Sequence, residues 1–251
     1  MQIAVAGKGG GGKTTFAALA IRELVAAGSG PVLAVDADAN ANLGEVLGLA
    51  FQETIADILA EMADDRRSRP GGMSKADYLN FRLHQALTEG PEVDLLVMGG
   101  PEGPGCYCYA NNLLRQFIEQ KARDYPVLVL DNEAGLEHLS RRTTRQVDIL
   151  VVVSDATVRG IRSAGRIYQL ATRLDLGIRR SCLVVNRVRE GTLLELEAEI
   201  GQTGLELAGC LPFDPAVETW DRQGKPLVQL PDDAPAVAAV REIVKRIVPK
   251  N

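Results

Sequence analysis

The sequence predicts an α/β fold: a single doubly wound, mainly parallel sheet of about seven or eight strands with helices on both faces. Seven short apolar runs recur along the 251 residues, and most are separated by stretches long enough for a crossover helix. Hydrophobic residues make up 46% of the chain but aromatic residues only 4%, which is typical of aliphatic strands packed against alanine-rich helices. Because such sheets commonly reach this length as one unit, we expect residues 1–251 to form a single domain.

The seven runs that we interpret as strands are rich in Val, Leu and Ile. They cover residues 2–6, 31–35, 93–98, 126–130, 148–153, 181–186 and 205–211. In a parallel sheet the carboxyl ends of the strands meet at one edge, and ligands bind there. Polar residues follow several of these runs directly, so this edge is where we expect the functional site.

Residues 64–90 stand apart from the alternation of strands and helices. They open with DDRRSRPGGMSK, whose charge and Pro/Gly content are typical of a loop, and an amphipathic helical pattern follows around residues 78–87. We therefore expect a peripheral helical insertion outside the sheet.

Charge and hydropathy argue against two classes of partner. The net charge of −5 gives no electrostatic footprint for nucleic acid. No apolar run is long enough to span a bilayer, and the chain enters its first predicted strand at Gln2 without a signal-peptide pattern. We expect a cytoplasmic protein that binds neither nucleic acid nor membrane.

The strongest motif is GKGGGGKTT at residues 7–15, between the first predicted strand and a helical stretch. It fits the phosphate-binding pattern G-x-x-x-x-G-K-[ST] in the context that this pattern requires. Glycines let backbone N–H groups and the helix N-terminus point at phosphates, with Lys13 on the β/γ-phosphates and Thr14 on Mg²⁺. The residues of this loop that we expect to bind ATP/ADP are Gly9, Gly10, Gly11, Gly12, Lys13, Thr14 and Thr15.

A second lysine, Lys8, follows the first glycine of the loop. With it the loop resembles the deviant Walker A group of P-loop NTPases, which includes nitrogenase iron protein, MinD, ParA and nickel-maturation ATPases. This resemblance implies ATP hydrolysis coupled to closure of a homodimer, in which Lys8 crosses to the nucleotide of the partner. The alternative is a solvated surface lysine.

Carboxylates follow two of the predicted strands. The run VDADANAN places Asp36 and Asp38 after the second strand, and Asp131 follows the fourth. Phosphoryl transfer to water needs a positioned nucleophile and a bound metal, and Asp residues at the mouth of a phosphate loop can serve both needs. The resemblance implies that Asp38 orients the attacking water, and we expect Asp36 to act on Mg²⁺ through waters. Asp131, at the end of its strand, can hold Mg²⁺ through water, and Gly135 is the expected moving switch.

The adenine pocket is also predicted by resemblance. Asn186, at the end of CLVVN, matches the adenine-recognising Asn of the group. Pro212 and Phe213, after the last predicted strand, match the segment that lines the base.

The four cysteines fall into two kinds. Cys182 and Cys210 lie in apolar runs and are expected to be small buried hydrophobes. Cys106 and Cys108 are separated by one residue in a loop rich in Gly and Pro, next to the start of a helix. Such thiols favour the thiolate form and make good ligands for soft metals.

Two thiolates supply half of a usual four-coordinate site. A twofold axis through the loop would supply the other half, because an isologous interface brings the same patch of both subunits together. Four thiolates are compatible with Ni²⁺ or Zn²⁺. The sequence therefore predicts a metal site shared by two protomers.

The motifs GKGGGGKTT, VDADANANLG, GPGCYCYANNLLR and LDNEAGLEHLSR together resemble the CooC-type nickel-maturation ATPases of carbon monoxide dehydrogenase. That resemblance implies an ATP-driven metallochaperone that holds Ni²⁺ on Cys106 and Cys108 of both subunits, with carbon monoxide dehydrogenase as the client. A related factor for acetyl-CoA synthase is an open alternative.

Two further classes compete. An iron–sulfur cluster could bridge the subunits, but the region after the fourth strand lacks the second cysteine that nitrogenase iron protein uses there. A ParA/MinD-type positioning ATPase would find support in the tail, where Val237, Val240 and Ile243 share a helical face. That pattern is also typical of a final helix packed on the sheet.

Overall fold

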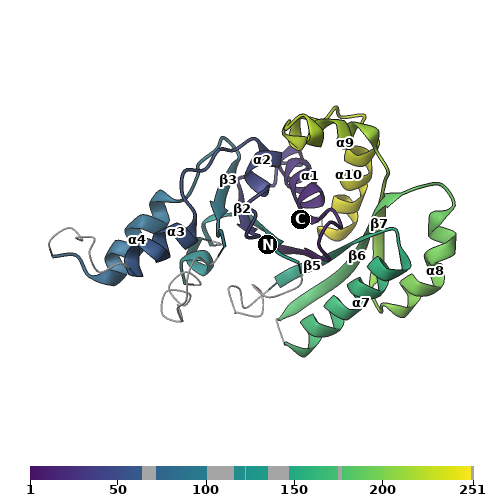
Figure 1. The fold of residues 1–251 in the computed structure, drawn as a ribbon, viewed down its shortest axis with the longest axis horizontal. Coiled ribbons are helices and arrows are strands. Elements are labelled where there is room, and N and C mark those ends of the chain that lie inside the picture. Colours follow the sequence, from purple (N-terminus) through teal and green to yellow (C-terminus); the bar gives the residue numbers. More distant parts are fainter. Residues whose placement is uncertain (64–71, 101–115, 122, 135–146, 175–176, 250–251) are drawn as a thin grey trace.

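The computed structural model describes residues 1–63, 72–100, 116–121, 123–134, 147–174 and 177–249, and Figure 1 shows its fold. All seven predicted strands are present in one sheet, in the order β3-β2-β4-β1-β5-β6-β7, and every neighbouring pair is parallel. The predicted fold class is thereby confirmed. The strands are β1 Gln2–Gly7, β2 Val32–Ala37, β3 Val93–Val97, β4 Val127–Asn132, β5 Val147–Asp155, β6 Ile178–Val188 and β7 Glu206–Pro212.

The central strands form because they are apolar on both faces. Every residue of β2 and of β4 is buried, as expected for parallel strands covered by helices on both sides. Successive side chains point to opposite faces. In β1, Ile3 and Val5 join one hydrophobic cluster, whereas Ala4 and Ala6 join the other.

The helices divide between these two clusters. One face packs against α1 Lys13–Ala26, α2 Leu43–Leu47, η1 Leu227–Gln229 and α10 Pro235–Ile247, and α9 Pro215–Arg222 lies on the same side (Figure 1). The other face packs against α3 Ile55–Ala63, α4 Lys75–Gln85, α7 Val158–Arg173 and α8 Thr192–Gln202. The sheet is therefore doubly wound.

Helix α4 is the amphipathic helix expected within residues 64–90, and α3 and α4 extend beyond the edge strand β3 (Figure 1). Leu79 and Leu83 are buried in the hydrophobic cluster of that face, whereas Phe81 is 48% exposed. Residues 64–71 lie outside the described residues. Whether 64–90 is an insertion within a single domain of residues 1–251 stays a prediction.

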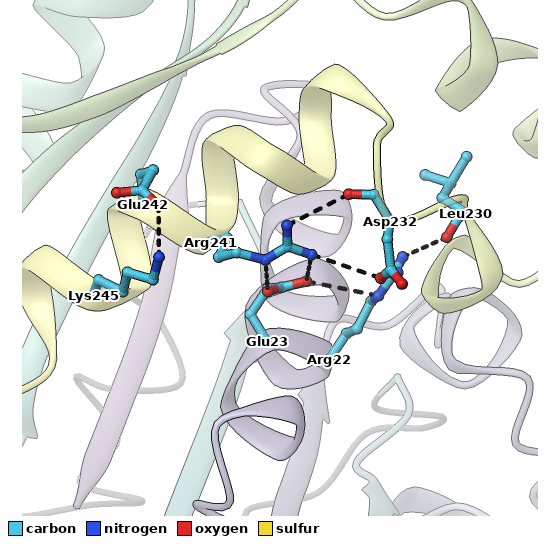
Figure 2. Close-up of polar contacts among 7 residues, drawn as sticks. All are labelled: Arg22, Glu23, Leu230, Asp232, Arg241, Glu242 and Lys245. Carbon is cyan, nitrogen blue, oxygen red and sulfur yellow. Dashed lines mark hydrogen bonds and ion pairs between the residues drawn. The ribbon is translucent and has the colours of Figure 1, made fainter.

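An ion-pair network ties the far end of α1 to α10 (Figure 2). Glu23 is buried and accepts from Arg241 Nε at 2.8 Å, and Arg22 donates to the carbonyl of Leu230 and to Asp232, both at 2.6 Å. A buried carboxylate is tolerated because charged hydrogen-bond donors compensate the loss of water. The network fixes α1 at the end opposite to the phosphate loop.

The tail forms α10 and packs on the sheet, as one of the two alternatives predicted. The apolar side chains that share a face are all buried: Val237, Val240, Ile243, Val244 and Ile247. Among the residues that the structure describes, no helix combines the length and the apolar character needed to cross a bilayer.

Candidate functional site

The candidate site lies at the carboxyl edge of the sheet, around the loop that follows β1. The chain leaves β1 towards β2 over one face and leaves β5 towards β6 over the other, while β1 and β5 are neighbours in the sheet. Such a reversal of winding opens a crevice in which α/β proteins bind ligands. The fold therefore places the GKGGGGKTT loop where a ligand is expected.

The loop enters α1 through a left-handed turn. Gly12 is the N-cap of α1 with φ of 94°, and Gly11 N–H donates to the carbonyl of Lys8 at 3.2 Å. No side chain caps the helix, so its first N–H groups are available to an anion. Gly9 and Gly10 are exposed at the mouth of the loop.

Lys13, Thr14 and Asp131 meet beneath this loop. Asp131 is 1% exposed, and no hydrogen bond of ordinary geometry from the described residues reaches either of its carboxylate oxygens. Burial raises the pKa of Asp131 to about 7; the Thr14 hydroxyl and the Lys13 ammonium lower the pKa, and the charges of Asp36 and Asp38 add to the rise. An unpaired buried carboxylate beside a threonine of a phosphate loop fits a divalent cation that is bound together with the nucleotide.

Asp36 faces Asp131 across the β2–β4 pairing but has a different environment. One oxygen accepts the N–H of Asp38 at 3.0 Å, and the other accepts the N–H of Leu43 at 2.8 Å. Burial raises the pKa of Asp36, and these two N–H groups oppose the rise. Asp36 therefore caps α2 from the neighbouring strand, whereas the side chain of Asn42, the N-cap residue, makes no capping hydrogen bond.

Asp38 follows β2 directly and is partly exposed. Its Oδ1 accepts from the backbone N–H of Asn40 at 2.9 Å and from the Asn40 amide at 2.8 Å. The Asp38 carboxylate is thus held by hydrogen bonds within its own loop.

Lys8 bridges the crevice between β1 and β5. Its ammonium lies 3.1 Å from Oδ2 of Asp155, the last residue of β5, and the two side chains are 42% and 24% exposed. Asp155 is held in place by the Thr157 hydroxyl, which donates to its other oxygen at 2.9 Å. Lys8 therefore has an ion-pair partner within the same chain, and both side chains of the pair keep contact with solvent.

The residues predicted around adenine gather at the ends of β6 and β7. Asn186 is buried, and its amide donates to the carbonyl of Gly11 at 3.1 Å. Pro212 pairs with Val188 across the two strands, Phe213 N–H donates to the carbonyl of Val188 at 2.9 Å, and the guanidinium of Arg189 lies 4.6 Å from the Phe213 ring centre. The sheet thus brings Asn186 against the phosphate loop and places Pro212 and Phe213 next to the end of β6.

The predicted metal-binding cysteines, Cys106 and Cys108, and the switch residue Gly135 lie outside the described residues. Cys182 is fully buried and Cys210 partly buried, and both are free thiols, as expected. Burial raises the pKa of Cys182 to about 12. Burial also raises the pKa of Cys210. In the described part of the chain, no group of three or more His, Cys, Asp or Glu side chains could hold a metal ion.

A hollow of about 1160 Å³ lies at the opposite, amino edge of the sheet. Three cationic residues that line it already have acidic partners: Arg179 with Asp148, Arg180 with Glu206, and Arg241 with Glu23. None of the motif residues within the described part of the chain lines this hollow, so we do not assign the candidate site to it.

Two residues of the site were not predicted from the sequence. Asp155 ends a strand and faces the loop, but the predicted apolar run stops at residue 153, two residues before it. Arg187, directly after Asn186, donates to the carbonyl of Gly10 at 3.3 Å. The polar residues after the fifth and sixth apolar runs could have indicated both positions.

Comparison with known proteins agrees with this geometry. The CobQ/CobB/MinD/ParA nucleotide binding domain matches residues 3–227. An uncharacterized ATP-binding protein of Methanocaldococcus jannaschii is 43% identical over 253 residues, covering 100% of both chains. The carbon monoxide dehydrogenase accessory protein CooC of Rhodospirillum rubrum is 32% identical over 240 residues, covering 89% of this chain and 88% of the relative.

The fold also resembles solved structures. A chain of the MinC:MinD cell division protein complex of Aquifex aeolicus superposes with a TM-score of 0.74 at 23% identity, covering 100% of this chain and 98% of the other. At that identity the likeness speaks for the fold alone. The family match and the relatives at 43% and 32% identity go further: the chain belongs to the CobQ/CobB/MinD/ParA family of P-loop nucleotide-binding proteins and is an ATPase.

Proposed function

We propose that this ATPase is a nickel metallochaperone that dimerises with ATP and carries Ni²⁺ on a Cys₄ site between two protomers for insertion into carbon monoxide dehydrogenase. The observation that carries the proposal is the Cys106-Tyr107-Cys108 sequence within a phosphate-loop ATPase. Two thiolates per chain make a complete soft-metal site only when a second chain contributes its own pair. The relative CooC, an accessory protein of carbon monoxide dehydrogenase, supports the same assignment.

In this proposal the described site residues divide the binding and hydrolysis of ATP between them. The loop of Gly9, Gly10, Gly11 and Gly12 binds the phosphates through backbone N–H groups, with Lys13, Thr14 and Thr15 at the start of α1. Thr14, Asp131 and Asp36 hold Mg²⁺, which neutralises charge on the phosphates when bound. Asp38 orients the attacking water, and Lys8 stabilises the phosphates of the partner's nucleotide.

Asn186, Pro212 and Phe213 form the adenine pocket in this proposal. The Asn186 amide donates one N–H to Gly11, and its oxygen accepts the Arg187 N–H at 2.9 Å. One N–H and one lone pair remain, which match the acceptor N7 and donor N6 of adenine. Guanine presents two acceptors at the same edge, so ATP should be preferred over GTP.

Cys108→Ser should abolish tight Ni²⁺ binding and leave the basal ATPase intact. Equilibrium dialysis with a non-hydrolysable ATP analogue should give one Ni²⁺ per two wild-type chains, and the variant should bind at least about a hundredfold more weakly. Cys210→Ser is the matched control, because burial raises the pKa of that thiol. Unchanged nickel affinity in the Cys108 variant would remove the metal assignment.

Lys8→Ala should weaken ATP-dependent dimerisation and hydrolysis while nucleotide binding by the single chain stays largely intact. The Lys8–Asp155 pair is partly exposed and is worth under about 1 kcal/mol, so Lys8 can exchange Asp155 for a phosphate of the partner at little cost. Sedimentation velocity with an ATP analogue measures the effect. Lys245→Ala is the control, and a fully dimeric Lys8 variant would contradict the role in trans.

Asp38→Ala should bind ATP normally but hydrolyse it on the order of a hundred times more slowly, giving a long-lived ATP-bound dimer. Asn40→Ala provides the comparison, because it removes the amide that holds Asp38 in its loop but keeps the carboxylate. Single-turnover hydrolysis separates the two variants. Rapid turnover by Asp38→Ala would show that another group positions the water.

The client and the alternative classes can be tested with the same protein. Activation of nickel-free carbon monoxide dehydrogenase supports the proposal, whereas activation of acetyl-CoA synthase alone would assign the related factor. ATP-dependent co-sedimentation with lipid vesicles, without nickel binding, would favour a MinD-like positioning ATPase. The burial of the apolar face of α10 argues against membrane binding through that helix.

A further inference from the structure

The end of β6 contacts the phosphate loop through two successive residues. Asn186 donates from Nδ2 to the carbonyl of Gly11 at 3.1 Å, and Arg187 donates from Nη1 to the carbonyl of Gly10 at 3.3 Å. Two neighbouring carbonyls of the loop are thus each held by a different side chain. The first of these contacts is buried.

Successive side chains of a strand normally point to opposite faces, so two neighbours cannot both reach one loop. The backbone of Arg187 resolves this conflict with a φ of 57°, in the left-handed region. The β6–β7 pairing changes register between Val185 and Val188, at this same point. The Asn186 side chain supports the turn by accepting the N–H of Arg187 at 2.9 Å.

A left-handed conformation at a residue other than glycine is unfavourable and persists where the surrounding structure requires it, most often at functional sites. Here the unfavourable turn, the register change and the two hydrogen bonds coincide at one residue pair. Since all of them direct side chains onto the loop, the pair has a structural task there.

We propose that Asn186 and Arg187 form a carbonyl clamp that positions the phosphate loop. With the carbonyls of Gly10 and Gly11 held by the clamp, the backbone of the loop is fixed in one orientation, which directs its N–H groups towards phosphate oxygens. The proposal rests on the proposed adenine-reading role of Asn186 and deepens it. The amide has donors for both Gly11 and adenine, so one residue links base recognition to the geometry of the phosphate site.

The decisive probe is a ligand without a base. Inorganic tripolyphosphate with Mg²⁺, measured by displacement of a fluorescent ADP analogue, reports on the phosphate loop alone. Asn186→Ala should weaken tripolyphosphate binding by about five- to tenfold, although this ligand offers no base for Asn186 to contact. The ATP-over-GTP preference should fall in this variant as well.

Arg187→Gly isolates the second half of the clamp. Glycine adopts a positive φ without cost, so this variant removes the guanidinium and relieves the backbone conformation, whereas Arg187→Ala removes only the guanidinium. Both variants should bind ATP and tripolyphosphate about fivefold more weakly than the wild-type protein, with an unchanged preference for ATP over GTP. Amide hydrogen exchange in residues 7–15 should become faster. Arg162→Ala, which loses a surface ion pair with Glu199, should change none of these values.

Unchanged tripolyphosphate affinity and unchanged loop exchange in both Arg187 variants would overturn the clamp. Failure of the adenine assignment looks different: Asn186→Ala would then weaken tripolyphosphate and ATP equally, without altering the preference between ATP and GTP. Nickel binding does not depend on either outcome and is measured separately with the Cys108→Ser variant. If the Asn186 variant does not fold, the two Arg187 variants still decide the question.

Discussion

Asp131→Asn should stabilise the nucleotide-free protein while reducing ATP hydrolysis on the order of a hundredfold or more. The carboxylate is buried without a hydrogen bond of ordinary geometry from the described residues, and its pKa of about 7 lies well above the ordinary value of 3.8. The difference corresponds to at most about 4 kcal/mol of unfavourable free energy at pH 8. An uncharged amide avoids most of this cost but is a poorer ligand for Mg²⁺.

The effect of Asp131→Asn should depend on pH with a defined sign. Between about pH 4 and pH 7 Asp131 binds more protons in the folded protein than in the unfolded chain, so its contribution to stability falls as the pH rises. In the Asp131→Asn variant this loss of stability with rising pH should be absent. Thermal unfolding without nucleotide should therefore show little difference near pH 4.5 and a melting temperature about 5–10 °C higher for the variant at pH 8.

Asp36→Asn is the matched contrast to Asp131→Asn. Each oxygen of Asp36 accepts a backbone N–H, and an amide can accept through only one atom. This variant should lower the melting temperature at pH 8 instead of raising it. If both variants were destabilised alike at that pH, the unpaired carboxylate of Asp131 would not be the cause of the predicted gain.

Gly12→Ala should abolish nucleotide binding at millimolar concentrations. A Cβ atom at residue 12 would lie 1.9 Å from Nδ2 of Asn186, and the φ of 94° is unfavourable for any side chain. Asn186 would have to leave the carbonyl of Gly11, so the base pocket and the phosphate loop would be disturbed together. The loss should exceed about a hundredfold in the dissociation constant of ADP, measured by calorimetry.

Gly10→Ala separates the two causes. Gly10 also has a positive φ, 72°, but a Cβ there would meet nothing within 4 Å. This variant carries the backbone cost of about 1–2 kcal/mol without the steric clash. It should lose no more than about tenfold to thirtyfold in affinity. Equal losses in the two variants would mean that contact with Asn186 is unimportant.

The strands were predictable from sequence because their burial is nearly continuous. Each predicted run overlaps an observed strand, and β2 and β4 are buried along their whole length. The ends were less predictable. β5 and β6 continue as far as the pairing of Asp155 with Asn186, beyond the apolar run of β5, because backbone pairing does not require apolar side chains.

The contacts within the site were mostly not predictable, because they depend on which strands are neighbours. Lys8 meets Asp155 only since β1 lies beside β5, and the order of strands is not encoded in any local pattern. The capping of Leu43 by Asp36 depends on how the intervening loop returns to β2. The left-handed backbone of Arg187 runs against the preference of that residue type and could not be inferred from it.

The attachment of α1 to α10 has a consequence for how nucleotide exchange is transmitted. The helix is about 20 Å long; its first turn follows the phosphate loop, and Glu23 near its other end is paired with Arg241. Because this pairing ties the far end of α1 to α10, we expect α1 to keep its position when a phosphate is released. We then expect the movement in the segment that follows β2, where Asp36 and Asp38 precede the short helix α2.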